Sequence, residues 1–89
     1  MTDLTVESAG GDAYRVTVSE TGSSTTHEVT VSAADLRRFG AGRSPEELIE
    51  ASFRFLLDRE PKESILGRLD LSVISQYFPD YPSRIGNYL

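Results

Sequence analysis

Residues 44–60 read SPEELIEASFRFLLDRE, and this stretch decides the fold. Ser44 can cap the start of a helix, a proline occupies the first helical position, and Glu47 can close a capping box. Pro61 removes a backbone donor and disfavours helix at the residue before it, so we expect the helix to end at about Glu60. The stretch therefore predicts one long helix.

The faces of this predicted helix differ in polarity. At 100° per residue, the charged side chains share one narrow face, and the other side chains occupy most of the remaining surface. The charged set is Glu46, Glu47, Glu50, Arg54 and Asp58, and the remaining set is Leu48, Ile49, Ser52, Phe53, Phe55, Leu56 and Leu57. So wide an apolar arc needs a sheet on one side and a second cover on the other.

Three segments before this helix alternate apolar and polar residues, which is the pattern of strands with one buried face. They are LTV at 4–6, YRVTV at 14–18 and HEVTV at 27–31, separated by the turn-forming stretches AGGD at 9–12 and TGSS at 21–24. Short turns between successive strands favour a three-stranded antiparallel β-meander. Its buried face is expected to carry Leu4, Val6, Tyr14, Val16, Val18, Val29 and Val31.

Shorter helices are predicted on both sides of the long one. Before it, Ser32 can cap SAADLRRFG, and Gly40 is expected to supply a left-handed stop. After it, a short helical turn in PKESILGRL is expected, and Asp70 can cap a helix in LSVISQYF that Pro79 ends. Three apolar side chains recur there at helical spacing and are expected to pack on the long helix: Leu71, Ile74 and Phe78.

Length and composition indicate a single α+β domain. The chain has 89 residues, which are too few for two domains. Its hydrophobic content of 38% is enough for a thin core. We expect a β-meander over 1–32, a helical connection and the main helix over 33–60, and a C-terminal helical segment and tail over 61–89.

Charge and cysteine content restrict the partners and the compartment. A net charge of −5 does not favour broad attraction to nucleic acid or anionic lipid. The absence of cysteine excludes disulfides, thiolate nucleophiles and cysteine-based metal sites. The N-terminal TDLTVESAG lacks the basic and apolar segments of a signal peptide, and no apolar run is long enough for a membrane span. We therefore expect a cytoplasmic protein.

The residues that could carry out chemistry are few and scattered. Glu46 and Glu50 lie one helical turn apart, but Glu50 and Arg54 also have the order favoured for an ion pair on a helix surface. His27, the single histidine, begins a strand in which Glu28 points to the opposite face. We expect no catalytic residue, no metal site and no cofactor.

The densest charged cluster is DREPKE at residues 58–63. Two charged residues end one helix, Pro61 forces a break, and two more begin the next short turn. We interpret this segment as a corner held by local ion pairs rather than as a chemical site.

A helix-turn-helix is the sharpest alternative interpretation of residues 63–78, ESILGRLDLSVISQYF. The stretch offers a short helix, a turn with glycine and a second helix with a polar outer side. However, the predicted second helix has no Lys or Arg, and Arg68 is the one basic residue of the whole stretch. We therefore do not expect nucleic acid binding.

The tail, DYPSRIGNYL at 80–89, is too apolar to stay in water. We expect it to dock on its own domain, and an arm exchanged between two copies is the alternative. The predicted interaction surface combines Tyr77, which precedes this tail, with four residues of the tail: Tyr81, Ile85, Tyr88 and Leu89.

Three segments together resemble a group of small conserved bacterial and archaeal proteins of uncharacterised function. They are HEVTV, SPEELIEASFRFLLDREPKESIL and DLSVISQYFPDY, which match an EVTV-like run, SPEEL, FLLEREP and FDLSVISRYFPEY in that group. The resemblance covers residues 27–81, with Leu69 where an aromatic is usual and Gln76 where arginine is usual. It implies no catalytic residue. The order of three strands and then helices also resembles HicB-type antitoxins, in topology alone.

Together, these observations predict a non-catalytic protein-binding or assembly module whose partner is another protein or a second copy of the chain. Two other classes stay open at this point. One is an antitoxin-like or helix-turn-helix transcriptional regulator, and the other is a minor enzyme based on carboxylates.

Overall fold

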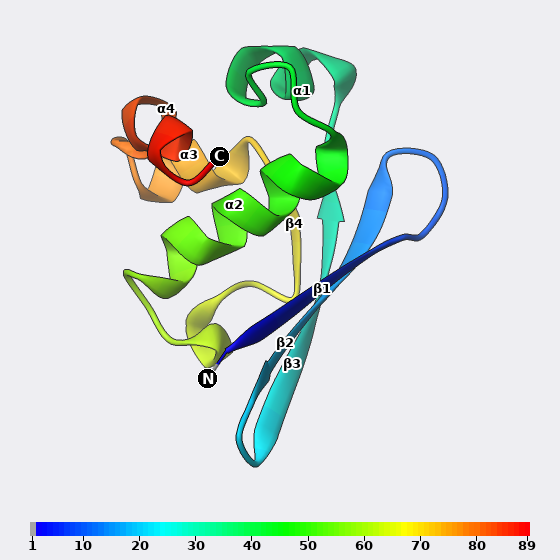
Figure 1. Cartoon of the computed structure of the whole chain (residues 1–89), viewed down its shortest axis with the longest axis vertical. Coiled ribbons are helices and arrows are strands. Elements are labelled where there is room, and N and C mark those ends of the chain that lie inside the picture. Colours follow the sequence, from blue (N-terminus) through cyan, green and yellow to red (C-terminus); the bar gives the residue numbers. More distant parts are fainter. Residues whose placement is uncertain (1) are drawn as a thin grey trace.

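A four-stranded sheet with helices packed on one face forms the protein in the computed structural model, which describes residues 2–89 (Figure 1). The predicted α+β architecture is therefore confirmed. In chain order the elements are β1 (Asp3–Ser8), β2 (Ala13–Glu20), β3 (Ser23–Thr30), α1 (Ala33–Phe39), α2 (Pro45–Leu57), the 3₁₀ turn η1 (Lys62–Ser64), β4 (Arg68–Asp70), α3 (Val73–Tyr77), α4 (Tyr81–Arg84) and the 3₁₀ turn η2 (Ile85–Asn87).

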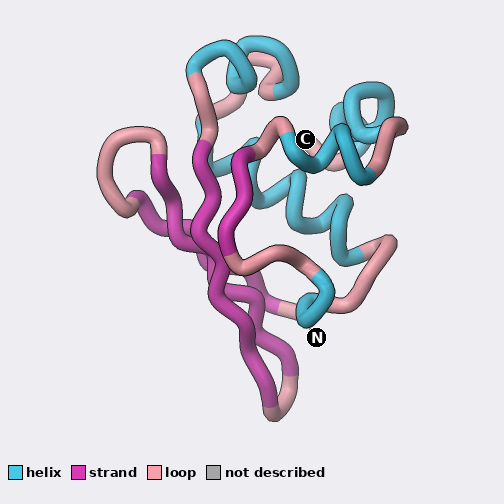
Figure 2. Tube along the Cα trace, turned by 180° about the vertical axis from the view of Figure 1, so that it is seen from behind, coloured by secondary structure: helices cyan, strands magenta, loops and turns pink. Residues whose placement is uncertain are grey.

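The sheet is larger and more complex than the predicted three-stranded meander, and that prediction is wrong. β1, β2 and β3 pair antiparallel in sequence order, but β4 adds to β3 in parallel, with Val29 opposite Leu69. Figure 2 shows the four strands side by side. Only the start of the helical turn predicted over 61–69 is present, as η1. A three-residue strand is too short to show a period, and its partner lies 40 residues away in the chain.

The two faces of the sheet follow the predicted alternation. The inner face carries buried Val16, Val18, His27, Val29 and Leu69, and partly buried Leu4, Val6 and Tyr14. On the outer face, one row crosses all four strands with charges of alternating sign: Glu7, Arg15, Glu28 and Arg68. Within this row, Arg68 Nε donates to Glu28 Oε2 at 2.9 Å.

In the described part of the chain β1 pairs with β2 alone, so its other edge is open.

The start of α2 forms as predicted. The Ser44 hydroxyl accepts from the Glu47 amide at 3.2 Å, and the Glu47 carboxylate accepts from the Ser44 amide at 3.2 Å. These hydrogen bonds, first the one from the Ser44 backbone, lower the pKa of Glu47. The end of α2 differs, because the helix stops at Leu57 rather than at Glu60. The amides of Arg59 and Glu60 both donate to the Leu56 carbonyl, so the chain forms a tight turn after the helix. The helix does not continue because Pro61 disfavours helical conformation at the residue before it.

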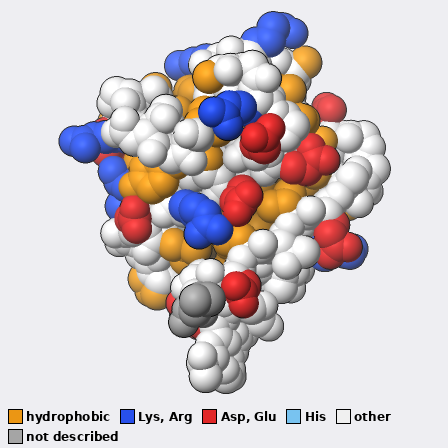
Figure 3. Space-filling model, in the orientation of Figure 1, with side chains coloured by type: hydrophobic (Ala, Val, Ile, Leu, Met, Phe, Trp, Pro, Cys, Tyr) orange, Lys and Arg blue, Asp and Glu red, His pale blue; other side chains and the backbone are white. Residues whose placement is uncertain are grey.

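α2 lies between the sheet and the C-terminal segment, as its wide apolar arc requires. On the sheet side, the Phe53 ring lies 5.3 Å from the ring of His27. On the other side, Phe55 makes edge-to-face contacts with Phe78, Tyr81 and Tyr88 at 5.9, 5.2 and 5.8 Å. The charged face of α2 is turned to solvent, where acidic and basic side chains gather (Figure 3).

Gly40 follows α1 with a right-handed conformation, so the left-handed stop predicted at this residue is wrong. Its φ is −81°, and the positive φ values fall on Ala41 and Gly42, at 49° and 82°. A Cβ at Gly40 would lie 2.5 Å from the carbonyl oxygen of Leu36, so only glycine fits without a shift. The predicted cap at the other end is present, with the Ser32 hydroxyl accepting from the Asp35 amide at 3.1 Å.

Replacing this glycine tests its packing role. Gly40→Ala is expected to lower the free energy of unfolding by about 1–2 kcal/mol, because the methyl group meets a fixed backbone oxygen. Gly86→Ala is the matched control, since a Cβ there meets nothing within 4 Å and its φ is not positive. Urea denaturation of both variants makes the comparison. Equal stabilities of the two would contradict the close contact.

Candidate functional site

The charged corner at residues 58–63 is tied into the fold mainly by partners distant in sequence. Arg59 donates to Asp80 at 2.7 Å and lies over the Phe55 ring at 3.7 Å, and Asp58 accepts from the hydroxyl of Tyr88 at 2.6 Å. The hydrogen bond with Arg59 lowers the pKa of Asp80. These contacts join the end of α2 to the C-terminal segment, where the sequence predicted pairs within the corner itself.

Lys62 belongs to the same corner and is 3% exposed. Its ammonium donates to Glu20 at 2.7 Å and to Glu63 at 2.6 Å. These hydrogen bonds, first the one with Glu20, raise the pKa of Lys62 and lower those of both carboxyl groups. Lys62 therefore ties η1 to the end of β2, and its ammonium is already occupied.

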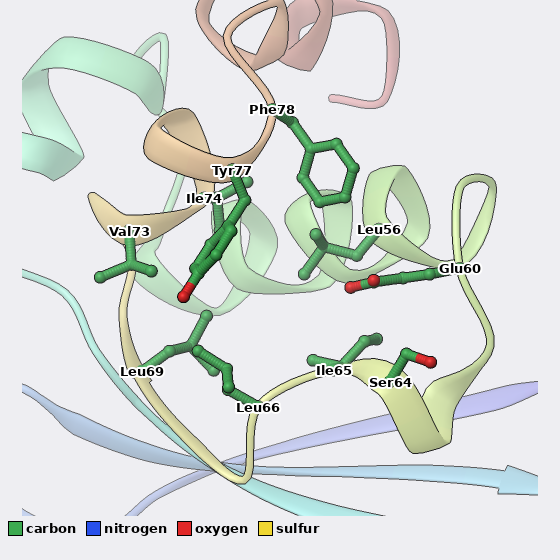
Figure 4. A pocket seen from close by; sticks show the side chains of 10 residues that line it. All are labelled: Leu56, Glu60, Ser64, Ile65, Leu66, Leu69, Val73, Ile74, Tyr77 and Phe78. Atoms are coloured by element: carbon green, nitrogen blue, oxygen red, sulfur yellow. The ribbon is translucent and has the colours of Figure 1, made fainter.

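Glu60 is the exception in this corner. Within residues 2–89 its carboxylate has no hydrogen bond and no ion pair. The side chain instead lines a cavity of about 260 Å³, and its carboxylate points into that cavity (Figure 4). We call this cavity the Tyr77 pocket. Its lining consists of Leu56, Glu60, Ser64, Ile65, Leu66, Leu69, Val73, Ile74, Tyr77 and Phe78.

The Tyr77 pocket arises where short elements meet without filling the space between them. α3 has five residues and η1 has three, so neither can cover the C-terminal end of α2 completely. Leu66 and Tyr77, at 47% and 66% exposure, are the large hydrophobic side chains that the described structure leaves exposed, and both line this pocket. In Figure 4, Glu60 and Ser64 lie at one end of the pocket, and Tyr77, Val73 and Leu66 lie at the other.

The five residues of the predicted interaction surface do not share one surface. Tyr81 and Ile85 are buried in the core, and Tyr88 and Leu89 pack partly against it. The Ser52 hydroxyl donates to the Leu48 carbonyl, so the Tyr81 hydroxyl must donate to Ser52, at 2.7 Å.

Burial raises the pKa of Tyr81 to about 12. This shift agrees with a phenol that is enclosed by the core. Of the five residues predicted for the interaction surface, Tyr77 alone is largely exposed, and it also lines the pocket.

His27 is held in place by two hydrogen bonds. Its Nδ1 lies 2.8 Å from the Leu66 carbonyl oxygen, which only accepts, so Nδ1 carries a proton. Its Nε2 lies 2.8 Å from the Thr25 hydroxyl. Glu28 points to the outer face, where it pairs with Arg68. His27 therefore fixes the segment that leads from η1 to β4, and with it the position of Leu66 at the pocket.

The other predicted candidates lie apart. Glu50 pairs with Arg54 at 3.0 Å on the solvent face of α2, and Glu46 is exposed near the start of that helix. Among residues 2–89, no group of three His, Cys, Asp or Glu side chains is arranged to hold a metal ion.

Residues 63–78 do not form two helices. They contain the end of η1, the strand β4 and the five-residue α3. The predicted helix cap at Asp70 is wrong, because α3 begins later and its N-cap is Ser72. The Asp70 carboxylate instead holds the turn before the helix, since its Oδ1 accepts from the amide and hydroxyl of Ser72 at 3.0 and 2.6 Å. In the described part of the chain, no helix combines the length and apolar composition needed to cross a membrane.

Comparisons with protein-family models, with curated proteins and with solved structures give no match to this chain. The functional interpretation therefore depends on the geometry of the Tyr77 pocket and on the charges around it.

Proposed function

We propose that this protein is a non-catalytic protein-binding module and that the Tyr77 pocket is its binding surface. The observation that supports this is the concentration of exposed apolar surface there. Leu66 and Tyr77 stand beside a cavity whose other walls are mostly apolar, with Glu60 and Ser64 as the polar residues. Apolar surface beside a concave site is a common feature of protein interaction sites, and tyrosine is enriched at their centres.

The chemistry of the pocket supports binding better than catalysis. Its lining has one carboxylate, that of Glu60, and no histidine, lysine or arginine. General acid–base catalysis usually uses two groups with different roles, and a covalent mechanism needs an activated nucleophile. Ser64 is the only aliphatic hydroxyl in the lining, and its oxygen points away from Glu60 (Figure 4). An enzyme based on carboxylates is therefore not the function proposed.

A DNA-binding regulator has little support from the same region. α3 carries no Lys or Arg, and Arg68 is paired with Glu28 on the outer face of the sheet. With a net charge of −5, the electrostatic attraction on which DNA binding depends is weak.

Selection from a random-peptide phage library tests the proposed function. The immobilised wild-type protein is expected to enrich peptides that perturb the amide resonances of Leu66, Val73 and Tyr77 in NMR titrations. Leu66→Asp is expected to weaken these peptides at least about tenfold, because it places a charge in an apolar contact. Its free energy of unfolding should change by no more than about 0.5 kcal/mol, since the side chain is half exposed.

Ala34→Asp is the matched control, because it adds the same charge at an exposed position on α1. It should bind the selected peptides as the wild type does. If no peptide is enriched over the bare support, or if the perturbed resonances lie away from the pocket, the proposed function is wrong.

A further inference from the structure

We infer that the partner presents a peptide segment in which a large apolar side chain stands next to a Lys or Arg. The apolar side chain enters the Tyr77 pocket, and the basic side chain pairs with Glu60. This inference rests on the proposed function and adds the chemistry of the partner. It follows from the position of Glu60, from the charges of its neighbours and from the size of the pocket.

The position of Glu60 makes its carboxylate available to a ligand. It points into the pocket from the end opposite Tyr77 (Figure 4). The basic side chains next to it in sequence are committed elsewhere. Arg59 binds Asp80 and covers the Phe55 ring, and Lys62 binds Glu20 and Glu63. No base of this chain neutralises Glu60 within the described residues.

A ligand that fills the pocket must therefore supply a cation for Glu60. A ligand that covers Glu60 removes water from the carboxylate, and an unpaired charge in an apolar contact is costly. Phe78, on the same side of the pocket as Glu60, adds an aromatic ring to the lining (Figure 4), and a guanidinium or ammonium group interacts favourably with such a ring. The site thus discriminates in favour of a basic side chain.

A second copy of the chain meets this requirement poorly. In a two-fold symmetric dimer the same patch faces itself, so two Glu60 carboxylates would be covered together. The pocket lining offers neither of them a cation. The charges therefore favour a different protein over self-association through this surface.

The size of the pocket favours a peptide segment over a free small molecule. A cavity of about 260 Å³ lies below the usual range for small-molecule sites and suits one large side chain. The exposed surfaces of Leu66 and Tyr77 extend the apolar contact beyond the cavity itself. A peptide backbone that carries further side chains can cover both.

Peptide selection on variants of Glu60 tests the inference. Wild-type protein is expected to enrich peptides in which Leu, Ile, Phe or Met adjoins Lys or Arg. Glu60→Gln should bind the same peptides about three- to fivefold more weakly, as expected for one partly exposed ion pair. Glu60→Lys should enrich peptides with Asp or Glu in place of the base. Glu46→Gln is the matched control, because it removes an exposed carboxylate of α2 outside the pocket.

Salt dependence gives a second measurement, by fluorescence anisotropy with one selected peptide. The affinity of the wild type should fall as sodium chloride rises, and that of Glu60→Gln should fall less. Apolar peptides enriched without any basic preference, and bound equally by Glu60→Gln, would overturn this inference and leave the proposed function standing. Pentylammonium chloride that binds as tightly as the peptides would also overturn it, because the site would then be a small-cation pocket.

Discussion

A chain that ends at Pro79 is expected to be largely unfolded at room temperature. Deleting residues 80–89 removes Tyr81 and Ile85, which are buried in the core, and uncovers the Phe55 ring. Burial of each such side chain contributes roughly 1.5–3 kcal/mol. The whole stability of a small domain is only about 5–15 kcal/mol, so the deletion removes a large part of it. Circular dichroism and urea denaturation of the truncated chain measure the loss.

A milder substitution keeps this test informative if the truncated chain does not fold at all. Ile85→Ala should cost about 2–4 kcal/mol, whereas Asn87→Ala, at an exposed position, should be nearly neutral. Light scattering of the full-length chain supplies the control for oligomeric state. A full-length dimer that becomes a folded monomer on deletion would mean that the tail is exchanged between two copies. A deletion that changes neither stability nor mass would contradict the packing of the tail.

The stability of the folded chain should fall in alkaline solution as Tyr81 ionises. Burial raises its pKa from 10.0 to about 12, so the folded state keeps the phenol proton that the unfolded state loses. The contribution is complete below pH 10 and is lost as pH rises from 10 to about 12. The difference between the two pKa values corresponds to roughly 2–3 kcal/mol. Urea denaturation at a series of alkaline pH values gives the slope.

Tyr81→Phe is the control for this slope. It removes the phenol but leaves Ser52 its hydrogen bond to the Leu48 carbonyl, so the variant should fold. The pKa of Lys62 is also raised, first by its hydrogen bond to Glu20, so its contribution to the stability of the protein is likewise lost as pH rises. This loss is common to the wild type and Tyr81→Phe. The comparison of Tyr81→Phe with the wild type therefore isolates the tyrosine. Identical alkaline slopes for the two proteins would show that Tyr81 is not the group responsible.

The parts of the fold that sequence reasoning predicted depend on neighbours in the chain. The cap at Ser44 depends on Glu47, three residues away, and the alternation in β1 to β3 depends on side chains that point to opposite faces. These local features can be predicted from the sequence because the geometry of a few neighbouring residues determines them. They are enough to predict the α+β class and the position of α2 between two covers.

Contacts between distant residues account for the parts that sequence reasoning missed. β4 exists because residues 68–70 pair with the edge of β3, 40 residues earlier in the chain. The Tyr77 pocket has the same origin, since it lies where η1, β4, α3 and the end of α2 meet. One available signal was Leu66, an apolar residue just before Gly67, and another was the excess of acidic over basic residues in DREPKE.

The open edge of β1 bears on how the molecule behaves at high concentration. A strand with a free edge can pair with the same edge of another molecule, and such pairing starts many aggregates. β1 carries Asp3 and Glu7 and no basic residue, so two such edges repel each other as they approach. At the other side of the sheet, β4 is only three residues long and offers little to pair with. The sheet is thus protected against edge-to-edge aggregation by charge at one end and by shortness at the other.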